Sequence, residues 1–167
     1  MTQDILAGIR EPFKIKEVER KYPFTYNESM NSVLLQELAR YNTLIETILG
    51  SLQVMLKTLE GKLVSNWETD EMLQSIKNNA IPEIWLKKSY PCKKSLLGYV
   101  DDLKKRLAVF EEWIQNGKPN CFWVSGFFFT QSFLTGMKQN FARKHHYPID
   151  KVDFSYKVLK FQDEPMC

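Results

Sequence analysis

The stretch ESMNSVLLQELARYNTLIETILGSLQVMLKTLE, residues 28–60, decides the fold of this chain of 167 residues. Its apolar residues recur at alternating spacings of four and three, which places them on one face of an α-helix. Asn27 is suited to cap the start of this helix and Gly61 to end it, whereas Gly50 weakens its middle. At about 1.5 Å per residue the helix would be roughly 50 Å long, which predicts a mainly α fold with one very long helix. The apolar face consists of Leu34, Leu38, Tyr41, Ile45, Ile48, Leu52, Met55 and Leu59.

Shorter helical segments flank this long helix. The charged segment 14–22 lies between two prolines, and residues 65–68 have the spacing of a capping box that opens a helix to about residue 77. Residues 82–88 are expected to form a turn or two of helix. A second apolar face ends before Gly117, and the sequence therefore predicts a helical bundle. This second face consists of Leu96, Val100, Leu103, Leu107, Phe110 and Ile114.

The segment 121–147, CFWVSGFFFTQSFLTGMKQNFARKHHY, has a different texture. Residues 121–124 have the pattern of a short buried strand, and a helix is expected from Thr130 or Ser132 to about residue 145. Apolar and polar residues alternate over 152–159, which is typical of a second strand. We therefore expect a small β element near the C-terminus in addition to the helices.

Four phenylalanines in this segment are the candidate site residues. Three consecutive aromatic side chains point to different sides in any regular structure, so at least one is expected to meet a surface beyond its own segment. Aromatic residues also have a large burial demand and little reaction chemistry. We therefore predict intramolecular docking through Phe127, Phe128, Phe129 and Phe133.

Composition limits the possible partners. The chain has 23 basic and 20 acidic residues and a net charge of +3, which is too small and too evenly spread to indicate nucleic acid. No apolar run approaches the ~20 residues needed to cross a bilayer. The first residues lack the features of a signal peptide, so a soluble, cytosolic protein is expected, with neither nucleic acid nor membrane among its partners.

The usual chemical motifs are missing from the sequence. There is no phosphate-binding loop of the GxxxxGK[ST] type, and Ser125 lacks the first glycine of a nucleophile elbow. His145 and His146 are adjacent, so on a helix they point about 100° apart and rarely share a metal. We therefore predict no catalytic, cofactor-binding or metal-binding residue.

Charged clusters lie on and before the second long helix. The carboxylate pairs 101–102 and 111–112 are expected on its solvent-facing side, with Asp101 pairing with Lys105. Basic residues at 87–88, 93–94 and 104–106 alternate with aromatic residues. They form either a contact for an acidic surface, such as RNA or tubulin, or a solvated face whose lysine stems cover apolar surface.

Several motifs resemble the C-terminal region of dynein heavy chains, and the similarity is greatest to the axonemal branch. It extends in order from about residue 5 to residue 159. The long run FWVSGFFFTQSFLTG is specific enough to exclude chance. The matching motifs are Pro12-Phe13, VERKYP (18–23), ESMNSVL (28–34), KSYP (88–91), FWVSGFFFTQSFLTG (122–136) and QNFARK (139–144).

The resemblance implies three parts. Residues 1–26 would end the preceding AAA+ module, the sixth in the motor, or connect to it. Residues 27–119 would be the helical part of the C-terminal domain. Residues 120–167 would be an aromatic strand–helix–strand segment leading toward a missing β-rich part. Residues 161–167 differ from the family's usual continuation into a β-barrel.

The resemblance also implies a role. The segment would brace the AAA+ ring and modulate ATP-driven, minus-end-directed movement along microtubules in the axoneme of cilia and flagella. ATP and Mg would bind elsewhere in the parent motor, which would hydrolyse ATP outside this chain. The partners would be the rest of the ring and the dynein complex subunits, with the microtubule reached only through the motor. The alternative is a free-standing helical adaptor that binds an acidic surface such as tubulin.

Overall fold

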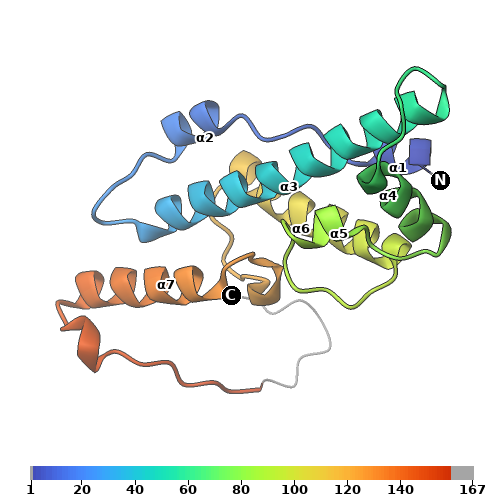
Figure 1. Ribbon diagram of the computed structural model, residues 1–167. Helices are drawn as coiled ribbons and strands as arrows, with labels where there is room; N and C mark the ends of the chain where they lie inside the picture. Colours follow the sequence, from blue (N-terminus) through green and yellow to red (C-terminus); the bar gives the residue numbers. More distant parts are fainter. Residues whose placement is uncertain (1, 159–167) are drawn as a thin grey trace. The chain divides into compact units, whose positions relative to one another are not determined.

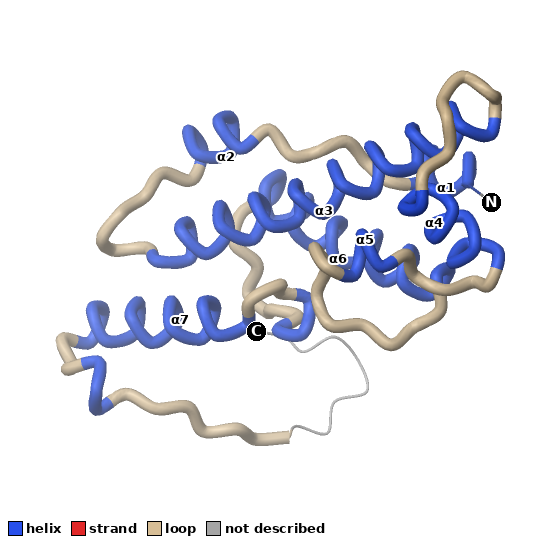
Figure 2. Tube along the Cα trace, viewed as in Figure 1, coloured by secondary structure: helices blue, strands red, loops and turns tan. Residues whose placement is uncertain are grey.

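The computed structural model describes residues 2–158, with side chains from residue 5 onward, as helices joined by loops (Figures 1 and 2). The η elements are single turns of 3-10 helix. The order along the chain is α1 (Thr2–Gly8), α2 (Ile15–Lys21), α3 (Ser29–Leu59), α4 (Trp67–Lys77), α5 (Glu83–Leu86), α6 (Leu96–Asn116), η1 (Val124–Gly126), α7 (Thr130–His145) and η2 (Ile149–Lys151).

Helix α3 confirms the central prediction. It has 31 residues, and the predicted apolar face is fully buried from Leu34 to Met55, whereas Leu59 in the last turn is exposed. Glu28 rather than the predicted Asn27 caps its start, since the Glu28 carboxylate accepts the backbone N–H of Met30 at 3.1 Å. Gly61 ends it with a φ of 72°, a left-handed conformation that glycine adopts without strain.

The remaining predicted helices are also confirmed, with boundaries that differ by a few residues at most. Helix α4 begins close to the predicted residue, but its cap is Asn66 rather than Ser65 of the predicted capping box: the Asn66 side chain accepts the backbone N–H of Thr69 at 2.9 Å. Helix α6 buries its predicted apolar face except for Ile114, which is half-buried, and buries Trp113 as well. A mainly α fold with one very long helix is therefore correct.

The predicted β element is wrong, because the described residues contain no strand (Figure 2). Residues 121–123 are irregular and lead into η1. Residues 152–158 are irregular as well, and the only pairing outside helices in the described part is an isolated bridge between Thr25 and Glu28. An alternating pattern forms a strand only where a neighbouring strand receives its backbone hydrogen bonds, and none of the described residues supplies one. Leu159 and residues 161–167, on which part of this prediction falls, lie outside the described residues.

The chain forms two compact units that differ from the three predicted parts. The first unit comprises Met1–Lys14 and Leu38–Val109, and the second comprises Ile15–Glu37 and Phe110–Cys167. Helices α3 and α6 each contribute residues to both units. The three-part division by family role is not tested by this packing and stays a prediction. Among the described helices, none joins sufficient length to sufficient apolarity for a membrane crossing.

The first unit is held together by buried polar contacts as well as apolar packing. The Asn42 side chain on α3 accepts the N–H of Phe13 at 2.7 Å and donates to its carbonyl at 2.8 Å. The Trp85 indole N–H donates to Ser51 Oγ at 2.8 Å, which fixes α5 against α3. These bonds satisfy buried polar groups that would otherwise lower the stability of the unit.

Candidate docking site

The second unit contains an aromatic cluster around two of the four predicted docking residues. Phe127 and Phe133 are buried with their ring centroids 4.5 Å apart. The Phe127 ring meets Phe110 edge-on at 5.5 Å, and the Phe133 ring lies 5.0 Å from Phe122. Such offset and edge-to-face pairs add to the stability that burial alone provides. Phe127 and Phe133 therefore belong to the core of this unit.

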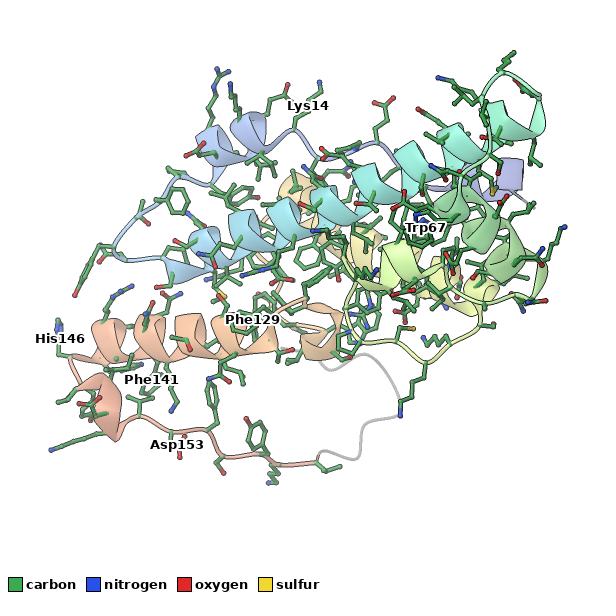
Figure 3. All side chains as sticks on the ribbon, in the orientation of Figure 1. Lys14, Trp67, Phe129, Phe141, His146 and Asp153 are labelled. Atoms are coloured by element: carbon green, nitrogen blue, oxygen red, sulfur yellow. The ribbon has the colours of Figure 1, made fainter. Side chains whose placement is uncertain are left out.

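The other two predicted residues lie nearer the surface. Phe128 is half-buried, and 50% of the Phe129 side chain is exposed at the start of α7, where Figure 3 labels it. The consecutive phenylalanines thus point in different directions, as the sequence predicted. Whether the four side chains contact another part of a larger protein stays a prediction.

A buried carboxylate of α3 fixes the start of α7. Glu37 is fully buried, and its carboxylate accepts the backbone N–H groups of Phe128 and Phe129, the latter at 3.0 Å. Phe129 occupies the N-cap position and has no polar side chain with which to cap the helix. Glu37 supplies the missing acceptor and places negative charge at the positive end of the α7 dipole. It therefore determines where Phe129 emerges at the surface.

The first turns of α3 pack closely on α7. A Cβ atom on Gly136 would lie 2.5 Å from Met30 Cε and 3.0 Å from Val33 Cγ2, so only glycine fits without displacement. Further along α7, Asn140 Oδ1 accepts the N–H of Ser29 at 2.8 Å. The two helices are therefore held at a fixed separation at the edge of the aromatic cluster.

Glu28, just before α3, forms one ion pair and accepts further hydrogen bonds within this unit. It pairs with Lys118 at 2.7 Å and accepts hydrogen bonds from Asn140 and from the Met30 N–H. Burial alone would raise the pKa of Glu28, but these hydrogen bonds together lower it below its usual value. The carboxylate is therefore charged and serves a structural role.

A pocket of about 340 Å³ lies between these two helices, beside Phe129. Its walls are hydroxyl and amide side chains with Val33, Phe129 and Gly136, and they include no titratable residue. Hydroxyl and amide groups can bind a partner's backbone, but they supply neither a general base nor a charged stabiliser. The lining residues are Ser29, Ser32, Val33, Gln36, Phe129, Gln131, Ser132, Thr135, Gly136 and Gln139.

The residues weighed for chemistry are not assembled into a reactive site. Ser125 lies in η1, while His145 lies in the last turn of α7 with its ring 4.4 Å from that of Phe141. Among the described residues, no group of three or more histidine, cysteine or acidic side chains could hold a metal ion. His146 ends α7 with a φ of 55°.

A buried ionic cluster in the first unit corrects the prediction that both carboxylates of the 101–102 pair face solvent. Asp102 is buried and accepts hydrogen bonds from Lys94 at 2.5 Å, Arg106 at 2.6 Å and Tyr90 at 2.9 Å. Burial alone would raise the pKa of Asp102, but these three donors lower it to about 2. Burial also raises the pKa of Tyr99, which is 5.7 Å from Tyr90 between ring centroids, to about 12. The predicted pair of Asp101 with Lys105 is confirmed at 2.8 Å.

Several of the basic residues predicted to contact an acidic surface form ion pairs within the first unit. Lys94 and Arg106 are neutralised by Asp102, Lys105 by Asp101, and Lys87 by Glu83 at 3.1 Å. Three carboxylates thus compensate three of the seven positive charges between residues 87 and 106. The predicted contact for an acidic surface at this position stays a prediction.

Taken together, the two units define a helical scaffold with buried structural carboxylates, an exposed aromatic edge and no assembled reactive groups among the described residues. Residues 1–166 match the family described as the C-terminal domain of the dynein heavy chain, and the protein belongs to that family. The resemblance seen in the sequence motifs is thereby confirmed.

Individual relatives support the same family. The protein is 47% identical to dynein axonemal heavy chain 1 of Rattus norvegicus and 46% identical to dynein axonemal heavy chain 3 of Mus musculus, and these matches cover 96% and 95% of its length. It is also 44% identical to dynein axonemal heavy chain 12 of Mus musculus over 96% of its length. The matched region spans only 4–5% of these relatives. All three relatives are axonemal heavy chains, which confirms the predicted axonemal branch. The predicted location in the cytoskeleton of the ciliary or flagellar axoneme is confirmed with it.

Proposed function

We propose that this protein is a non-catalytic part of a dynein motor that braces the AAA+ ring and modulates ATP-driven, minus-end-directed movement along microtubules. ATP and Mg bind, and ATP is hydrolysed, in other parts of the heavy chain. The partners of this segment are the rest of the ring and the dynein complex subunits, and it reaches the microtubule only through the motor. Its family, together with relatives far longer than this segment, supports the proposal.

The observation that carries the bracing role is the exposed apolar surface where α3 turns into α4. Within the first unit, 94% of Val64 and 70% of Trp67 are exposed, and Leu59 and Leu63 beside them are exposed as well. Apolar side chains that are close in sequence and all exposed are typical of a surface that another part of a protein covers. In the second unit, Phe129 at the start of α7 is likewise an exposed apolar side chain that another part of the motor can cover.

A binding experiment with matched variants tests this role. A heavy-chain ring that lacks this segment should bind the added segment, and Val64→Ser with Trp67→Ser should weaken binding at least about tenfold, as expected for loss of a buried aromatic anchor. Leu97→Ser is the control, because Leu97 is similarly exposed but lies at the start of α6. Equal binding by the wild type, the double variant and the control would contradict the proposal that Val64 and Trp67 contact the ring.

Two further measurements separate the rival functions. The purified protein should release no phosphate from ATP in a single-turnover assay, because none of its motifs can hold the nucleotide's phosphates. The protein should also remain in the supernatant when microtubules are sedimented at low and at moderate salt. Pelleting that weakens with salt would instead support the free-standing adaptor.

A further inference from the structure

A second pocket of the second unit lies at the C-terminal end of α7 and shares only Gln139 with the lining of the pocket described above. It has a volume of about 540 Å³. Figure 3 labels His146, which is on its wall at the end of α7. The lining residues are Tyr26, Asn27, Gln139, Ala142, Arg143, His146, Tyr147 and Ile149.

No described carboxylate pairs with Arg143, the arginine on the wall of this pocket. Arg143 donates from Nη1 to Ser29 Oγ at 2.7 Å and to the Tyr26 carbonyl, and its guanidinium lies 4.3 Å from the centroid of the Tyr26 ring. All of these partners are uncharged. Lys144 follows in the sequence and is exposed. The site therefore has positive charge that is held in place but not neutralised.

The backbone at this end of α7 does not cancel that charge. The C-terminal end of a helix carries a partial charge of about −0.5, which is smaller than the +1 of Arg143 on the pocket wall; Lys144, which is not part of the wall, adds exposed positive charge beside it. The carbonyls of Ala142 and Arg143 also accept the N–H groups of Tyr147 at 3.0 Å and His146 at 3.4 Å. Nearby carboxylates are mostly engaged, since Glu28 pairs with Lys118 and Asp153 with Lys138. Asp150 is the exception, and it is exposed beside Ile149 in η2.

The uncharged walls fit a peptide. The exposed rings of Tyr26 and Tyr147 can cover the methylene groups of a glutamate, and their hydroxyls can donate to its carboxylate. Asn27 and Gln139 present amides, the groups that match a peptide backbone in both donor and acceptor. Because the tyrosines are 76% and 60% exposed, the pocket is an open trough suited to a peptide segment that passes through it.

We propose that this pocket binds a glutamate- or aspartate-rich peptide segment of a partner protein. Arg143 and Lys144 attract the carboxylates, Tyr26 and Tyr147 flank one acidic side chain, and the amides of Asn27 and Gln139 bind the backbone on either side. The proposal does not depend on the bracing role, because it uses the opposite end of α7 from Phe129.

Fluorescence anisotropy with the whole protein tests the proposal. A labelled Glu-Gly repeat peptide should bind at low ionic strength and more weakly at physiological ionic strength, and a Gln-Gly repeat peptide should not bind. Arg143→Gln should raise the Kd about tenfold, the expected effect of losing one charge-assisted contact. Lys57→Gln, which removes the same charge from an exposed position in the first unit, should leave the Kd unchanged.

A second variant protects the test against misfolding, since Arg143 also holds the Tyr26 loop to Ser29. Tyr147→Ala changes an exposed side chain and should raise the Kd about threefold while the protein still melts cooperatively. An unchanged Kd for Tyr147→Ala would overturn the proposal, as would equal weakening by Arg143→Gln and Lys57→Gln. Tighter binding of single-stranded RNA or phosphatidylserine vesicles than of the acidic peptide would also overturn it.

Discussion

Replacing Glu37 by glutamine tests whether the buried carboxylate organises the aromatic segment. Glutamine keeps one acceptor oxygen but puts an NH2 group where the second oxygen accepted a backbone N–H. At least one of the Phe128 and Phe129 amides then loses its acceptor. A hydrogen bond to a charged group is worth about 1.5–3 kcal/mol, and the lost charge at the α7 N-terminus adds about 0.3–1 kcal/mol. We expect Glu37→Gln to lower the free energy of unfolding by about 2–4 kcal/mol.

Urea denaturation monitored by tryptophan fluorescence would measure this change, with Trp113 and Trp123 reporting on the second unit and Trp67 and Trp85 on the first. Amide hydrogen exchange should accelerate at Phe128 and Phe129 in particular. Glu46→Gln is the matched control, because it makes the same change on an exposed position of α3 and should alter the free energy by less than about 0.5 kcal/mol. A loss below about 1 kcal/mol for Glu37→Gln, or unchanged exchange at both amides, would refute the role assigned to Glu37.

Other substitutions have defined expected outcomes. Because the folded-state pKa of Asp102 is depressed to about 2, the stability that its charged form contributes is complete above pH 4 and is lost as the pH falls toward 2. Urea titrations should show a loss of about 2 kcal/mol in the free energy of unfolding over that range. The Asp102→Asn variant should lack this pH-dependent loss. Gly136→Val should cost about 1–3 kcal/mol in thermal or urea unfolding, because its side chain would overlap Met30 and Val33. Gly50→Ala should raise stability by about 0.5–1 kcal/mol, since a Cβ there meets nothing within 4 Å in the middle of α3.

The helices could be predicted from the sequence because each carries local signals. The spacing of Leu34, Leu38 and Tyr41 shows a helical face without knowledge of what covers it. The Asn66 cap and the left-handed Gly61 are determined within one turn of the backbone. The burial of Phe127 and Phe133 could be expected from their aromatic character, but the partner ring of Phe127 could not, since Phe110 lies on α6, outside the segment 121–147.

The prediction of a β element was wrong because a strand needs a partner strand, which can lie far away in the sequence. Residues 152–158 have an alternating pattern, yet Tyr156 and Val158 are exposed and no described segment pairs with their backbone. Alternation reports which side chains would share a face, but it does not report whether a second strand exists. A helix contains its own hydrogen-bond partners, and this difference explains why the two kinds of prediction fared differently.

Glu37 and Asp102 are the two buried carboxylates that matter most for structure; Asp102 was expected to face solvent, and no prediction was made for Glu37. A positional signal was present in each case. Glu37 lies three residues after Leu34 and four before Tyr41, both on the apolar face of α3, and Asp102 lies three after Tyr99 and four before Arg106 on α6. An acidic residue at those spacings is directed inward, where its carboxylate requires hydrogen-bond donors. For Asp102 the donors are side chains nearby in the sequence, Lys94 and Arg106. For Glu37 they are backbone amides some ninety residues away at 128 and 129, and no periodicity within α3 could have identified them.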